Sequence, residues 1–167
     1  DITINMNLKE YNKSVDLYAD RLYRFVFKNM KDSERAQDVV QDVFEKVWKK
    51  VDEISAEKIK SYLFTAAYHT MLDVLKKDKR VSHYENEREF EQSYSKEYSG
   101  VNEILENALN TLPEIQKNVI LLRDYEGYSY EEIGEITNLK DSQVKVYIYR
   151  ARKALQKYLV SIETVLG

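Results

Sequence analysis

The sequence predicts an all-α protein made of two small helical domains. Apolar residues recur at helical spacing through both halves of the chain, and an aperiodic acidic stretch separates the halves. The 167 residues include only four glycines and one proline, too few for the turns of a sandwich or barrel of short strands. A chain of this length suits one ordinary domain or two small ones.

Three helices are predicted in the first half. Residues 12–30 show helical apolar spacing without a breaker, and Asp32 is placed to cap the second helix. A third apolar stripe covers residues 59–75 and ends in a basic cluster at 76–80. The inward row of the second helix is expected to be Ala36, Val40, Val43, Phe44, Val47 and Val51.

A linker is predicted at residues 81–100, which lack periodicity and are rich in Glu, Ser and Tyr. The domains are therefore expected at 6–80 and 101–162. The second domain begins with a helical stripe that ends before Pro113. The proline suits the first turn of a helix that stops near Gly127.

The end of the chain has the layout of a helix-turn-helix. Ser129 with Glu132 forms a capping-box pattern for a short helix, and Asn138 can take the left-handed conformation in the turn that follows. A last helix is expected over residues 141–161, and Val144, Ile148, Ala151 and Leu155 form its inner face.

The outer face of this last helix could enter a major groove, with cations at the phosphates and other side chains at base edges. The alternative is a solvated basic helix within a bundle; we favour DNA because a generic amphipathic helix would not need the capped helix and turn before it. The residues of the outer face are Lys145, Val146, Tyr149, Arg150 and Lys153.

The charge is unevenly distributed, although the net charge is only −3. Residues 81–106 hold seven acids and two bases, residues 58–80 hold six bases and two acids, and residues 138–158 hold six bases and one acid. Two basic segments thus flank an acidic one. This layout suits a protein that touches a polyanion in two places while staying nearly neutral.

Residues 112–155 resemble domain 4 of an extracytoplasmic-function (group IV) RNA polymerase sigma factor of the sigma-70 family. The likeness lies in the initial LP, the GYSYEEIGEI block, the VK pair and the RARKAL ending. SERAQDVVQDVFEKVW resembles the core-binding part of domain 2 in the same family, and KSYLFTAAYHTMLDVLKKDKR resembles its promoter −10 part. Both halves occur in the family's order, which makes the resemblance specific.

The resemblance implies roles for residues in the first domain. Asp38, Gln41 and Asp42 would meet the clamp helices of the polymerase beta-prime subunit; from spacing alone they form a solvated acidic face. Family members commonly have Arg and Asn where this sequence has Tyr68 and His69, so it departs from the family there. The residues implied for the −10 element are Tyr68, His69, Lys76, Lys77, Lys79 and Arg80.

No residue set for catalysis, metal binding or a cofactor is found. The chain has no cysteine, its two histidines are far apart, and its glycines are too dispersed to cradle a phosphate. We expect no enzyme activity, cofactor or metal. No apolar run reaches the length of a membrane span and no secretory signal opens the chain, so a cytoplasmic protein is expected, with Met6 as its natural start.

The sequence is interpreted as a dissociable initiation subunit of RNA polymerase. It would bind the core enzyme at the beta-prime clamp helices and the beta flap, and recognise promoter −10 and −35 elements. The resemblance implies an anti-sigma factor as a further partner. The alternative is a stand-alone helix-turn-helix regulator that binds a palindromic duplex as a dimer without polymerase.

Overall fold

The computed structural model describes residues 5–84 and 100–166, which form two compact helical units. Within these residues one isolated antiparallel bridge joins Asn5 to Ser55, and no strand forms. The predicted all-α class is confirmed. Residues 1–4 and 85–99, the latter being most of the predicted linker, lie outside the described residues.

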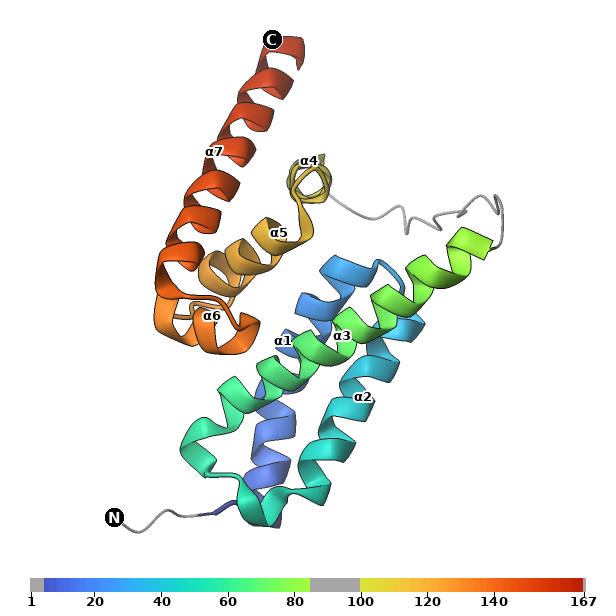
Figure 1. The fold of residues 1–167 in the computed structure, drawn as a ribbon, viewed down its shortest axis with the longest axis vertical. Helices are drawn as coiled ribbons and strands as arrows, with labels where there is room; N and C mark the ends of the chain where they lie inside the picture. The colour runs from blue at the N-terminus through green and yellow to red at the C-terminus, as the bar shows by residue number, and fades with distance from the viewer. Residues whose placement is uncertain (1–4, 85–99, 167) are drawn as a thin grey trace. The chain divides into compact units, whose positions relative to one another are not determined.

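The first unit consists of three long helices, α1 (Leu8–Met30), α2 (Ser33–Lys49) and α3 (Ile59–Tyr84), each packed against the other two (Figure 1). Two short 3-10 turns, η1 (Val51–Glu53) and η2 (Ala56–Lys58), connect α2 to α3. The core they enclose is apolar and fully covered, which accounts for the stripes in the sequence. Its largest members include Leu22, Phe25, Leu63, Phe64 and Met71.

Local capping explains where these helices begin. Asn7 accepts a hydrogen bond from the Glu10 backbone N–H at 2.9 Å, so α1 starts at Leu8, earlier than the predicted residue 12. Asp32 accepts from the Arg35 backbone N–H at 3.2 Å, which confirms the predicted cap of α2. Between the two helices Lys31 takes the left-handed conformation, with φ 56°.

The inward row of α2 differs from the prediction at one residue. Val39 is buried, whereas Val40 is only half-buried. Val51 also falls outside α2, in η1, and is half-buried. The expected i, i+4 pair from Ala36 to Val40 was therefore wrong, because Ala36 and Val39 at i, i+3 face the same neighbours equally well.

The second unit contains α4 (Gly100–Asn110), α5 (Glu114–Ile120), a π-helical turn η3 (Leu121–Tyr125), α6 (Tyr130–Thr137) and α7 (Asp141–Leu166). The long helix α7 packs against α4, α5 and α6. Two ends extend beyond the predictions: α3 continues to Tyr84, into the segment predicted as linker, and α7 continues to Leu166 rather than residue 161. Neither extension meets a proline or an interior glycine, so nothing in the sequence stops the helix.

Candidate nucleic-acid interface

The predicted helix-turn-helix is confirmed in α6, α7 and the turn between them. Ser129 Oγ accepts from the Glu132 backbone N–H, and Glu132 Oε1 accepts from the Ser129 backbone N–H, both at 3.1 Å. Asn138 ends α6 in the left-handed conformation, with φ 58°. The Leu139 N–H then donates to the Gly134 carbonyl at 3.1 Å, which closes the turn before α7 begins at Asp141.

This turn needs glycine at position 134. A Cβ there would lie 2.8 Å from the backbone oxygen of Leu139 and 3.6 Å from Asp141 Oδ1. The first distance is shorter than real Cβ contacts allow, and the neighbour is backbone rather than a flexible side chain. The close approach of α6 to the turn therefore depends on the missing side chain.

Gly134→Ala is expected to destabilise the second unit, by up to about 2 kcal/mol. Alanine gains about 1 kcal/mol of helix propensity, but relieving the clash costs about 1–3 kcal/mol. Urea unfolding of the full chain followed by circular dichroism measures the loss, and fluorescence of the single tryptophan, Trp48 in the first unit, should not change. Gly100→Ala is the matched control, since no atom lies within 4 Å of its Cβ. Equal stability of both variants would contradict the close-approach argument.

The faces of α7 divide as expected. Val144, Ile148 and Ala151 are buried, whereas Leu155 is half-buried. All five residues of the predicted DNA face, Lys145, Val146, Tyr149, Arg150 and Lys153, are exposed. Tyr149 is 64% and Val146 44% exposed, and Lys153 Nζ lies 5.8 Å from the Tyr149 ring centre. The helix thus presents cations together with uncovered apolar surface.

An open hollow of about 370 Å³ lies along this face of α7. Tyr130, the first residue of α6, forms one wall, and Lys145, Tyr149 and Lys153 line it from α7. Ile148, Arg152 and Gln156 also border it. An anionic group approaching α7 here would meet Lys145, Lys153 and two tyrosines.

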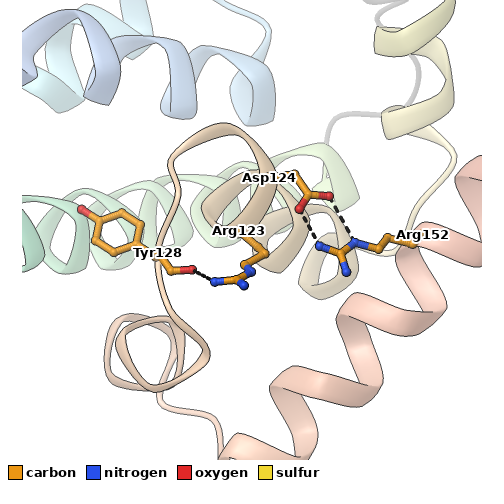
Figure 2. Close-up of polar contacts among 4 residues, drawn as sticks. All are labelled: Arg123, Asp124, Tyr128 and Arg152. Atoms are coloured by element: carbon orange, nitrogen blue, oxygen red, sulfur yellow. Dashed lines mark hydrogen bonds and ion pairs between the residues drawn. The ribbon is translucent and has the colours of Figure 1, made fainter.

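Two arginine contacts near this hollow were not predicted from the sequence (Figure 2). The Arg152 guanidinium donates to both oxygens of Asp124 in η3, from Nη2 at 2.7 Å and from Nε at 3.3 Å. These hydrogen bonds raise the pKa of Arg152 above its ordinary value. Arg123 Nη1 donates to the Tyr128 carbonyl at 2.8 Å, and its guanidinium lies 4.7 Å from the Tyr130 ring centre.

The residues predicted for the −10 element are not all accessible. Tyr68 is 5% exposed and belongs to the core of the first unit, so its predicted base-stacking role does not fit this structure. The helical spacing of α3 turns Tyr68 inward beside Leu63, Phe64 and Ala67. His69 is exposed, and its ring lies 5.4 Å from that of Tyr68, edge to face. Also exposed are Lys76, Lys77, Lys79 and Arg80.

The acidic row of α2 lies opposite its buried face. Asp38 and Gln41 are exposed, and Asp42 is half-buried and paired with Lys46 at 2.9 Å. Trp48 follows Gln41 at i+7, is 44% exposed, and packs its ring 5.0 Å from that of Tyr11. Trp48 was not predicted from the sequence as a surface residue of this row, although a large aromatic residue outside the apolar stripe is a signal of such a site.

No group of three or more His, Cys, Asp or Glu side chains that could hold a metal ion occurs within residues 5–84 and 100–166. Over the same residues, no helix is both long and apolar enough to cross a membrane.

Comparisons with known proteins match both units to regions of one protein family. The family model Sigma-70 region 2 matches residues 15–81, and Sigma-70, region 4 matches residues 102–155. The RNA polymerase sigma factor SigV of Bacillus subtilis is 33% identical over 135 residues, which cover 80% of this chain and 81% of that protein. The ECF RNA polymerase sigma factor SigE of Mycolicibacterium smegmatis is 26% identical over 162 residues, covering 91% of this chain and 62% of that protein.

A solved structure is similar over most of the chain. It is the sigma factor RpoE from Bartonella quintana, crystallised in complex with the anti-sigma factor NepR. The TM-score is 0.77 at 26% identity, and the match covers 91% of this chain and 98% of that one.

Proposed function

The chain belongs to the extracytoplasmic-function group of the sigma-70 family of RNA polymerase sigma factors, and on this premise we propose how its surfaces direct promoter-specific initiation. The first unit acts as sigma domain 2, binding core polymerase and the −10 element. The second acts as sigma domain 4, with α7 in the −35 duplex. No chemical step is proposed for the chain itself. Because its proposed partners are RNA polymerase and promoter DNA, we place its action in the cytoplasm.

The observation that carries the −35 proposal is the exposed face of α7 in a helix-turn-helix. Lys145 and Val146 lie in the first turns of α7, where a recognition helix meets base edges. Lys145 reads a base edge, while Val146 makes an apolar contact such as one with a thymine methyl. Arg150 binds mainly phosphate. Tyr149 and Lys153 complete the surface along the same face.

The −10 proposal rests on His69 and the basic end of α3. An exposed imidazole can stack on an unpaired base, and the four cations at 76–80 can follow the phosphates of a melted strand. Tyr68 supports His69 from the core instead of touching DNA. Asp78 does not neutralise these four cations, because it forms an ion pair with Arg35 of α2.

The polymerase proposal rests on the acidic row of α2. Asp38, Gln41 and Asp42 meet the beta-prime clamp helices, and the second unit meets the beta flap, as the family resemblance implies. Trp48 at the end of the row is a suitable apolar anchor, since tryptophan is enriched among interface residues that dominate binding.

We also propose an anti-sigma factor as a regulatory partner that buries one or both DNA faces. The support is that a similar protein was solved with an anti-sigma factor bound.

Runoff transcription with core polymerase tests the proposed function. Specific transcripts from a cognate promoter are expected only when core and this chain are both present. A palindromic footprint by the chain alone, without stimulation of core, would instead favour the stand-alone regulator.

A further inference from the structure

Arg152 lies within the basic stretch of α7, between Arg150 and Lys153, yet its guanidinium is already occupied. Nη2 and Nε donate in parallel to the two carboxylate oxygens of Asp124, at 2.7 and 3.3 Å. Such a two-point contact fixes orientation as well as distance. Its partner lies 28 residues earlier in the sequence, so the pair joins α7 to a different element of the fold.

That element is the π-helical turn η3, whose consecutive residues Arg123 and Asp124 reach different helices. Asp124 holds α7 through Arg152. Arg123 holds the entry to α6, through the Tyr128 carbonyl and the face of the Tyr130 ring. Figure 2 shows the two contacts leaving the same turn. Both helices of the helix-turn-helix are therefore positioned relative to one short segment, and π-helical turns are often found at functional sites.

We infer that Asp124 and Arg152 are positioning residues for −35 recognition, and that Arg152 does not bind phosphate. The inference rests on the proposed function of α7. An exposed ion pair adds little to stability, and here the side chains are 50% and 41% exposed. Its value lies in orientation, because recognition tolerates only small displacements of the contacting groups.

The competing interpretation makes Arg152 a further phosphate contact that Asp124 partly neutralises. The two interpretations differ in sign at Asp124. If the pair positions α7, then Asp124→Asn weakens −35 binding just as Arg152→Gln does. If Asp124 competes with phosphate for Arg152, then Asp124→Asn strengthens binding.

The test uses the full chain assembled with core polymerase, and measures promoter affinity over a range of salt concentrations. Asp124→Asn and Arg152→Gln are each expected to weaken binding roughly 3- to 10-fold. The double variant should lose no more affinity than the more strongly affected single variant, as for residues that act through one contact. The salt slope should not change. Arg152→Lys should restore part of the affinity, and all variants should match wild type on a promoter with a scrambled −35 element.

Lys157→Gln is the matched control, an exposed cation later on the same helix, and is expected to leave affinity unchanged. A salt slope lowered by about one in Arg152→Gln, tighter binding by Asp124→Asn, or additive losses in the double variant would each overturn the inference. If wild type itself fails to direct −35-dependent initiation, the proposed function fails. If wild type succeeds and the variants equal it, only the inference fails.

Discussion

Holoenzyme formation is expected to fail when Asp38 and Asp42 are both replaced by lysine. Both lie on the face of α2 opposite its buried residues, and in the proposed complex they meet the clamp helices. Juxtaposing like charges at an interface costs several kcal/mol, so core affinity should fall by about 100-fold or more. Folding should survive, because the ion pair that the described residues show for these two acids is Asp42 with Lys46, a largely solvent-exposed i,i+4 pair worth about 0.3–0.5 kcal/mol.

A titration of labelled chain with core polymerase measures this loss, and circular dichroism checks the helical content. The matched control is Asp16→Lys with Asp20→Lys, two exposed acids at the same i, i+4 spacing on α1. Undiminished core binding by the α2 variant would move the docking surface elsewhere. Loss of helical content in that variant alone would show that these residues support the fold.

The second large effect is expected at the start of α7, where Lys145→Ala should relax promoter selectivity at one base pair. A side chain that reads a base edge contributes about 1–3 kcal/mol of discrimination, or about 5- to 150-fold. Arg150→Ala should instead weaken all −35 sequences alike and lower the salt slope by about one, because a phosphate contact carries no sequence information.

Transcription from promoters altered at single −35 positions, at two salt concentrations, separates these two outcomes. Lys157→Ala serves as a reference for removing an exposed cation from α7, one helical turn beyond Lys153, the last residue of the proposed face. Unchanged activity and selectivity in both the Lys145 and Arg150 variants would refute docking of α7 in the major groove.

The helix-turn-helix could be predicted because its signals are local. A capping box needs only Ser129 and Glu132 in the right order, and a left-handed turn residue needs only Asn138. The same holds for the outer face of α7, since helical periodicity places Val144 and Ile148 on the buried face and Lys145 and Tyr149 on the exposed one. These features depend on residues within about two helical turns of one another.

Other features depend on distant residues and gave no such signal. Tyr68 looks equally suited to a base or to a core, and only packing against the other helices of the first unit buries it. Asp124 and Arg152 are ordinary charged residues until η3 and α7 meet. The prediction that Val40 rather than Val39 is buried was wrong for the same reason, because tertiary contacts decide which of two adjacent valines packs into the core.

A tethered cleavage reagent tests most directly whether α7 lies in the −35 duplex. The chain has no cysteine, so Ser142→Cys, an exposed and nearly isosteric change in the first turn of α7, gives one attachment point for an iron chelate. Ser161→Cys, about 28 Å further along the helix, is the control. In holoenzyme on a cognate promoter, cuts from position 142 should cluster in the −35 element and be absent or much weaker from position 161. Cleavage outside that element, or equal patterns from both positions, would contradict the docking of α7 there.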